Sequence, residues 1–282
     1  MQVTINPGNE KLYNARAAIP DAKDIADRWA KKSAAARANL KNHPDISYGD
    51  SPREILDIYP AGSPKAPVMM FIHGGYWQAR EPKDFHFIAP ELVKLGFCVV
   101  LAGYDLCPKV TVEKITSQMQ QAAAHIWHNI GTYGGNRDRL YVSGHSAGGH
   151  LTAEMMATDW SQIDIEIPNN YVKGGIPISG IFDLEPLVTT SINENIQFDL
   201  ESAKRCSPLL RDTVSTGPII LAVGGDESIG FHDQSDRLQA KWGPKLASTL
   251  RINLEGAHHL GAVDELAKPG SPLLTEVAKL LA

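Results

Sequence analysis

Residues 140–148 are Leu-Tyr-Val-Ser-Gly-His-Ser-Ala-Gly, and this stretch decides the fold. A short apolar run, Leu140 to Ser143, leads into a Gly-x-Ser-x-Gly pattern at 144–148, and a helix-compatible segment from Ala147 to Thr158 follows. In such a pattern a strand turns sharply into a helix, the serine takes a strained conformation, and the two glycines let the backbones approach each other. We therefore expect Ser146 to stand at the start of a helix as an accessible nucleophile.

Apolar runs and helical patterns alternate along the rest of the chain. The apolar runs are short and partly β-branched, which is typical of strands covered on both faces. This order predicts the α/β class, with a mostly parallel central sheet and helices on both of its faces. The expected strands are 54–59, 67–72, 97–102, 140–143, 219–223 and 252–254, and the expected helices are 85–95, 112–133, 147–158, 233–246 and 273–281.

Two segments lie outside this alternation. Residues 1–50 form an expected N-terminal extension, in which an Ala-rich helix from Pro20 to Leu40 precedes a loop rich in Pro and Gly. Residues 182–208 have a weak helical pattern and are a candidate cap, or else a surface connection without a role. The whole chain, 1–282, is expected to form a single domain.

The composition excludes several classes of protein. The chain has 282 residues, with 27 Lys+Arg against 32 Asp+Glu and a net charge of −5, which argues against binding to nucleic acid or an anionic membrane. No stretch approaches the roughly 20 apolar residues of a membrane span. The first thirty residues lack the apolar core of a secretory signal, and the three cysteines (98, 107 and 206) form no close pair. A cytoplasmic location is therefore expected.

A second glycine motif lies upstream of the serine. The sequence His-Gly-Gly-Tyr-Trp at 73–77 directly follows the expected strand 67–72. Glycines are needed in such a loop because the amides must turn inward with no side chain in the way, and those amides then stabilise the oxyanion of a tetrahedral intermediate. The expected oxyanion donors are the backbone N–H groups of Gly74, Gly75 and Ala147.

The aromatic pair Tyr76 and Trp77 follows the glycines of this loop. Beside an oxyanion site, these rings are candidates for stacking on an aromatic substrate. The alternative is that they are ordinary core aromatics. Both interpretations stay open at the level of the sequence.

A serine nucleophile needs a base, and the base needs an orienting acid. In this type of fold the acid follows a late strand and the histidine lies in the last loop. The run 219–223 is followed by Gly-Gly-Asp-Glu, and we prefer Asp226 over Glu227 because it lies nearer the end of the strand. His258 and His259 precede the last helix, and the residues alone favour neither of them.

The other histidines near these motifs are His73, His145 and His150. Their spacing matches no common zinc pattern, and His73 is expected to bond the backbone and hold the glycine loop. The chain also lacks nucleotide-binding motifs. No metal and no cofactor are expected.

Motifs in seven parts of the chain together indicate a protein family. They are YNAR at 13–16, HGGYWQ at 73–78, YDLCP at 104–108, GHSAGGH at 144–150, SGIFDLEP at 179–186, GDES at 225–228 and Gln234-Ser235. Together they resemble the α/β-hydrolase family of kynurenine formamidases (arylformamidases). In that family the catalytic histidine stands three residues after a glycine, so Gly256 points to His259, with Leu260 in place of the usual phenylalanine. The resemblance implies Ser146 as nucleophile, Asp226 as acid, His259 as base, and Gly74, Gly75 and Ala147 as oxyanion donors.

The resemblance also implies a function. It is that of a cofactor-independent hydrolase that cleaves a C–N bond through an acyl-enzyme and releases formate from an N-formyl aromatic amine such as N-formylkynurenine. Because this fold and these residues support many acyl groups, the alternatives are a carboxylesterase for short acyl esters and a non-catalytic sensor of a small ligand. The expected partner is a small molecule, and the family suggests a homodimer.

Overall fold

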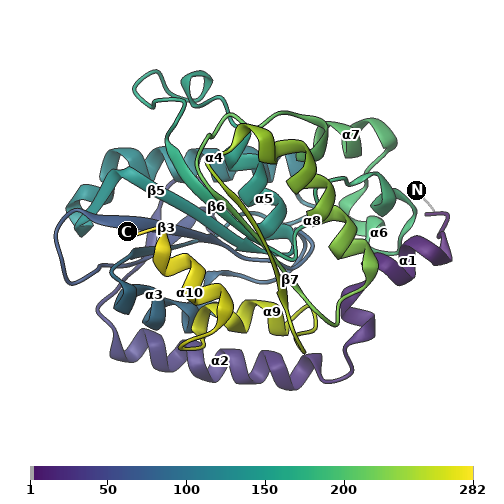
Figure 1. Ribbon diagram of the computed structural model, residues 1–282, viewed down its shortest axis with the longest axis horizontal. Helices are drawn as coiled ribbons and strands as arrows, with labels where there is room; N and C mark the ends of the chain where they lie inside the picture. The colour runs from purple at the N-terminus through teal and green to yellow at the C-terminus, as the bar shows by residue number, and fades with distance from the viewer. Residues whose placement is uncertain (1–2, 282) are drawn as a thin grey trace.

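The computed structural model describes residues 3–281 and contains one twisted eight-stranded sheet (Figure 1). The strand order is β1-β2-β4-β3-β5-β6-β7-β8. β1 and β2 are antiparallel to their neighbours, while β4, β3 and β5 to β8 run parallel, which confirms the predicted sheet. The strands are β1 (His43–Ser47), β2 (Ile55–Tyr59), β3 (Ala66–Ile72), β4 (Cys98–Ala102), β5 (Gly135–His145), β6 (Val172–Ile178), β7 (Ile219–Gly224) and β8 (Thr249–Leu254).

Successive residues of the central strands enter two separate apolar cores. In β3, Val68, Met70 and Ile72 face one core, while Met69 and Phe71 face the other. All seven residues of β3 are buried. A strand with both faces covered needs apolar residues at every position, which is why the central strands were visible as continuous apolar runs.

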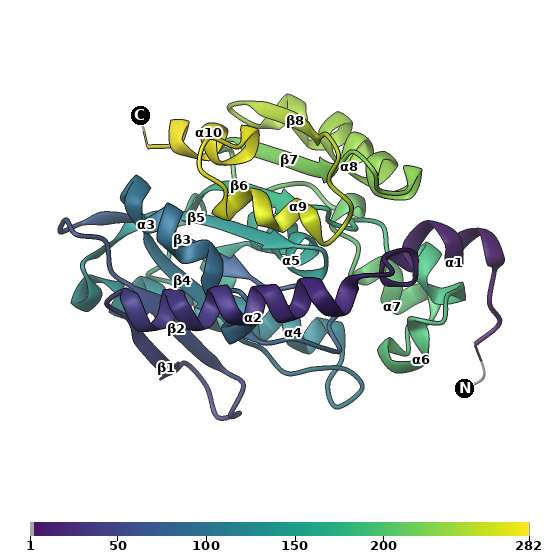
Figure 2. The same cartoon turned by 90° about the horizontal axis from the view of Figure 1, so that it is seen from below.

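Helices cover both faces of the sheet, as Figures 1 and 2 show. One face carries α4 (Val112–Asn129), α5 (Ala147–Met156) and α8 (Ile229–Trp242). The other carries α2 (Ala22–Asn39), α3 (Ala89–Leu95), α9 (Gly261–Asp264) and α10 (Pro272–Lys279). Among the described residues, no helix is both long and apolar enough to cross a membrane.

Two strands were not expected from the sequence. β1 occupies a segment predicted as a loop; it is an edge strand with mostly exposed residues, so it carries no apolar run. β6 lies in the middle of the sheet, but Gly174, Gly175 and Pro177 interrupt its apolar pattern. A Cβ at Gly175 would lie 2.2 Å from the sulfur of Met156 in α5, so the side chain of Met156 occupies the space that a larger residue would need. Tertiary packing has overridden strand propensity here.

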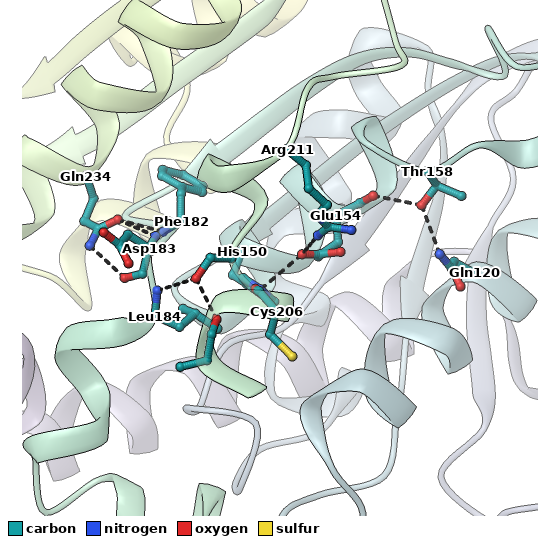
Figure 3. Close-up of polar contacts among 12 residues, drawn as sticks. Gln120, His150, Glu154, Thr158, Phe182, Asp183, Leu184, Cys206, Arg211 and Gln234 are labelled. Atoms are coloured by element: carbon teal, nitrogen blue, oxygen red, sulfur yellow. Dashed lines mark hydrogen bonds and ion pairs between the residues drawn. The ribbon is translucent and has the colours of Figure 1, made fainter. Parts of the chain in front are cut away.

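The segment 182–208 contains the short helices α6 (Asn193–Ile196) and α7 (Leu200–Arg205) and is tied to the body of the protein. His150 in α5 donates from Nε2 to the carbonyl of Cys206 (2.7 Å), and the side-chain oxygen of Gln234 in α8 accepts from the amides of residues 182 and 183 (2.9 and 2.8 Å) (Figure 3). Buried hydrogen bonds of this kind cost free energy to break. They attach the segment to α5, the helix that follows Ser146, and to α8. A further short helix, α1 (Pro7–Tyr13), lies at the N-terminus.

The buried imidazole of His150 should make stability depend on pH. Burial lowers the pKa of His150 to about 3, whereas a histidine in the unfolded chain titrates near about 6.5. The folded pKa is the lower one, so the stabilisation is present above about pH 6.5 and is lost as the pH falls towards 3. When the pH falls from about 7.5 to 5.5, the free energy of unfolding should decrease in both proteins. We predict that it decreases by about 1.4 kcal/mol more in the native chain than in His150→Gln.

Urea denaturation at the two pH values measures this difference. The glutamine amide can still donate to the Cys206 carbonyl, so the variant removes the titration and keeps the hydrogen bond. Equal losses in the two proteins would show that His150 does not resist protonation.

Candidate active site

The turn between β5 and α5 holds Ser146 in a strained conformation. Its φ of 58° and ψ of −117° lie where residues other than glycine rarely occur. A Cβ at Gly144 would lie 2.2 Å from the carbonyl oxygen of Gly148, and a Cβ at Gly148 would lie 1.9 Å from the carbonyl oxygen of Ile72. Both glycines of the motif are therefore required for the helix to start this close to β3.

A chain of two hydrogen bonds joins the Ser146 hydroxyl to a buried carboxylate. Ser146 Oγ lies 2.9 Å from Nε2 of His259, and Nδ1 of His259 lies 2.6 Å from Oε2 of Glu227. The side chains of His259 and Glu227 are 7% and 1% exposed. The ring of Phe231 packs against the imidazole with 4.6 Å between ring centres. This geometry can move a proton from the hydroxyl to the imidazole.

The structure corrects the choice of Asp226. β7 ends at Gly224, and the amide of Glu227 donates back to the Gly224 carbonyl (3.1 Å), so the chain reverses over residues 224–227. This turn points Glu227 towards His259 and leaves Asp226 exposed, without a side-chain hydrogen bond to any described residue. Distance from the strand end, the criterion used on the sequence, takes no account of this turn.

The carboxylate of Glu227 is held by several donors. Oε1 accepts from the hydroxyl of Ser179 and from the amide of Gly224 (2.7 Å), while Oε2 faces His259. Burial on its own would raise the pKa of Glu227, but the charge and hydrogen bond of His259, with the bonds from Ser179 and Gly224, lower it below the usual value. The carboxyl group of Glu227 is therefore ionised when the imidazole of His259 takes up a proton.

Of the two adjacent histidines, the structure brings His259 to Ser146. The ring of His258 instead accepts a hydrogen bond from the amide of Gly261 (3.0 Å) at the start of α9. His145, for which the sequence suggested no role, donates from Nε2 to the carbonyl of His259 (2.8 Å). Burial lowers the pKa of His145 to about 3, so this ring stays neutral while it fixes the main chain of His259.

The three amides expected to bind an oxyanion lie beside the nucleophile and remain available. Gly74 packs against the turn, where an added Cβ would lie 3.1 Å from the Cβ of Ser146. Within residues 3–281, the N–H groups of Gly74, Gly75 and Ala147 donate to no protein acceptor. His73 bonds to the carbonyl of Gly74 through Nδ1 (2.8 Å), as expected of a residue that holds the loop.

A cavity of about 360 Å³ opens over Ser146 and His259. Three aromatic rings contribute to its wall: Trp29, Tyr76 and Phe85. Parts of the wall come from the N-terminal segment, from α2 and from the segment 182–208. The YNAR motif at 13–16 supplies Asn14 and Arg16, but the sequence alone did not assign these residues to the site. The lining residues are Asn14, Arg16, Trp29, Gly74, Gly75, Tyr76, Gln78, Ala79, Arg80, Phe85, His145, Ser146, Ser191, Ile192, His259 and Leu260.

The two aromatic residues after the glycines have different positions. Trp77 is fully buried, meets His150 edge-on with 5.1 Å between ring centres, and does not line the cavity, so it is a core aromatic and the candidate stacking role was wrong for it. Tyr76 does line the cavity, and its hydroxyl donates to the carbonyl of Tyr13. Both residues have positive φ, 50° and 57°, and this backbone conformation sends the neighbouring rings in different directions.

Within the described part of the chain, no group of three or more His, Cys, Asp or Glu side chains is arranged to hold a metal ion. The three cysteines are free and buried.

We predict that Glu227→Gln lowers kcat by roughly 10³- to 10⁴-fold, because an amide neither fixes the tautomer of His259 nor stabilises its charged form. Asp226→Asn should change kcat by less than about threefold, as expected of an exposed side chain outside the hydrogen-bond chain. Steady-state kinetics on one substrate checks both variants. A larger loss of kcat in Asp226→Asn than in Glu227→Gln would show that Asp226 is the acid that orients His259.

The parallel sheet, the strained serine and its bonded histidine define the class of α/β hydrolases. The family model BD-FAE matches residues 56–242. A kynurenine formamidase of Danio rerio is 34% identical over 208 residues, which are 71% of this chain and 69% of that protein; the kynurenine formamidase of Salmo salar is 33% identical over 234 residues, or 79% and 76%. The chain therefore belongs to the BD-FAE family and to the kynurenine formamidase family of α/β hydrolases.

Among solved structures, one described as a putative thioesterase from silicibacter sp. tm1040 has a TM-score of 0.83 and 29% sequence identity. The match covers 93% of this chain and 96% of that one. The shared architecture thus extends over nearly the whole chain.

Proposed function

We propose that this chain is a serine hydrolase that cleaves an N-formyl aromatic amine, of the N-formylkynurenine type, to the free amine and formate. The observation that carries the proposal is the hydrogen-bonded chain from Ser146 through His259 to Glu227, at the base of a cavity with aromatic walls. Two relatives named kynurenine formamidase support the choice of the formamide bond. The three residues take the roles of nucleophile, base and orienting acid.

The first half of the reaction acylates Ser146. Nε2 of His259 accepts the hydroxyl proton as Oγ attacks the formyl carbon, and Glu227 stabilises the imidazolium that forms. The carbonyl electron pair becomes an oxyanion, which the amides of Gly74, Gly75 and Ala147 stabilise. Loss of one such donor typically costs roughly 2.7–4 kcal/mol of transition-state stabilisation. Collapse breaks the C–N bond as His259 gives its proton to the departing nitrogen.

The second half releases formate. Water takes the place of the departed amine, His259 removes a proton from it, and the resulting hydroxide attacks the formyl ester on Ser146. The same amides stabilise the second oxyanion. Collapse restores the serine hydroxyl with the proton held by His259, so no cofactor is consumed.

The shape of the cavity supports an aromatic leaving group. Trp29 and Phe85 are buried against each other with 5.4 Å between ring centres, and Tyr76 adds a third ring. An aromatic amine packed against these rings would gain apolar contact and ring–ring interactions. A formyl group occupies only the space between Ser146 and the amides of the glycine loop.

We predict a much higher kcat/KM for N-formylkynurenine than for p-nitrophenyl acetate. The expected reason is that the departing arylamine needs the proton that His259 supplies, whereas a nitrophenolate departs without one and gains nothing from this group. Absorbance assays of both reactions with the same preparation measure the ratio. A preference for the ester would favour the carboxylesterase alternative.

Covalent labelling separates an enzyme from a ligand sensor on the same scaffold. A fluorophosphonate should add to the native chain at Ser146, and intact mass should show no adduct on Ser146→Ala. Turnover by that variant should fall to the roughly 10³- to 10⁴-fold enhancement over water that binding and the oxyanion amides supply. An unlabelled native chain would support the sensor.

The choice of base has its own test. His259→Ala should lower kcat by several orders of magnitude, because no other group lies within hydrogen-bond distance of Ser146 Oγ among the described residues. His258→Ala should leave kcat within about threefold. A larger loss from His258→Ala would move the base to that residue.

A further inference from the structure

Most polar side chains in the wall of the cavity already have protein partners. Asn14 donates to Glu10 (2.7 Å), and Ser191 donates to Glu10 through its hydroxyl (2.6 Å). Gln78 donates to the carbonyl of Ile192 (3.1 Å) and accepts from Asn195 (2.8 Å). These groups build the wall and are not free to bind a charged ligand.

The guanidinium groups of Arg16 and Arg80 differ from these side chains in having few protein partners. Within residues 3–281 Arg16 makes no side-chain hydrogen bond or ion pair, although it lines the cavity. Arg80 is 22% exposed and reaches Asp84 only at 4.0 Å. Its guanidinium lies 5.8 Å from the ring centre of Trp29, another wall residue. The cavity lining contains two arginines and no carboxylate, in a chain of net charge −5.

The position of Arg80 is fixed by the backbone that carries it. Its φ of 76° lies in the left-handed region, and its carbonyl accepts a hydrogen bond from Arg53. Residues 75–80 thus continue from the oxyanion amides directly to this arginine. A second hollow of about 440 Å³ also has Arg16 and Arg80 in its lining, together with Lys23, Arg53 and the carboxylates of Glu81 and Asp84. This neighbouring hollow carries charges of both signs, whereas the lining of the cavity over Ser146 carries the arginines without a carboxylate.

The charge of Arg80 acts on groups beside the nucleophile. Burial is the largest cause of the lowered pKa of His145, and the positive charge of Arg80 contributes to it. The same arginine contributes to the lowered pKa of His73. An anionic group held by Arg80 would therefore sit within electrostatic reach of the reacting atoms.

We infer that Arg80, assisted by Arg16, binds a carboxylate on the departing amine of the substrate and so makes the enzyme selective for anionic formamides. The inference rests on the proposed function. A formyl group has a single carbon and no ionisable group, so any negative charge of the substrate must be on the amine that departs. A guanidinium fork matches a carboxylate with two parallel hydrogen bonds, and the ring of that amine would lie on the Trp29 and Phe85 wall.

A pair of substrates that differ in one group tests the inference. The pair is N-formylkynurenine and its decarboxylated analogue, which keeps the formanilide and the side-chain amine. The native chain should have at least a tenfold higher kcat/KM for the carboxylate. Arg80→Gln should raise KM for N-formylkynurenine by roughly 10- to 100-fold, change its kcat little, and leave the analogue unaffected.

Two further variants sharpen the result. Arg80→Lys should recover only part of the affinity, because an ammonium keeps the charge but cannot make the two parallel bonds. Arg37→Gln is the matched control: this arginine lies in α2, pairs with Asp45 at 3.6 Å and does not line the cavity. This variant should leave kcat/KM unchanged for both substrates. Equal kcat/KM values for the two substrates in the native chain, or equal losses for both in Arg80→Gln, would overturn the inference and leave the formamidase proposal intact.

Failure of the proposed function is distinguished by a binding measurement. If the native chain hydrolyses neither formamide, calorimetry with kynurenine and with kynuramine, which lacks the carboxylate, still tests the subsite. The native chain should bind kynurenine at least tenfold more tightly than kynuramine. Arg80→Gln should bind the two amines about equally. Equal binding of the two amines, or binding of neither, would overturn the subsite as well.

Discussion

The close approach of α5 to β3 is the constraint on which the rest of the site depends. Gly148 lies so near the carbonyl of Ile72 that any side chain would collide with it, and Gly144 is equally near Gly148. Only with both contacts can the chain turn within a few residues and hold Ser146 in its strained conformation. The same approach places the glycine loop after β3 against the serine, so Ser146 and the amides proposed to bind the oxyanion are positioned by one contact.

Parallel strands end at one edge of the sheet, and this edge assembles the chemistry. The loops after β3, β5, β7 and β8 supply the amides, Ser146, Glu227 and His259. Ligand sites in open α/β sheets lie beyond the carboxyl ends of the strands for this reason. Buried hydrogen bonds from Ser179 and the Gly224 amide fix the side chain of Glu227, and one from His145 fixes the main chain of His259, so the proposed proton transfer needs little reorganisation.

The cavity, in contrast, is completed by segments outside the alternating strands and helices. Glu10 joins the N-terminal segment to Ser191, and the hydroxyl of Tyr76 reaches the carbonyl of Tyr13. His150 and Gln234 attach the segment 182–208 to α5 and α8. The proposed catalytic residues thus lie at the edge of the sheet, while part of the wall of the cavity comes from these additions. Substrate preference can therefore differ between relatives that share the same catalytic residues.

By itself the sequence determined the parallel sheet, the strained turn at Ser146 and the glycine loop, because apolar periodicity and steric demands on glycine act over a few residues. It favoured Asp226 over Glu227, which was wrong, it separated His259 from His258 only through the family resemblance, and it did not show β6 as a strand. Only the tertiary structure decided that Glu227 faces His259, that Trp77 enters the core and that Arg16 and Arg80 both line the cavity. Each of these outcomes depends on contacts between segments distant in the chain, and no local pattern encodes such contacts.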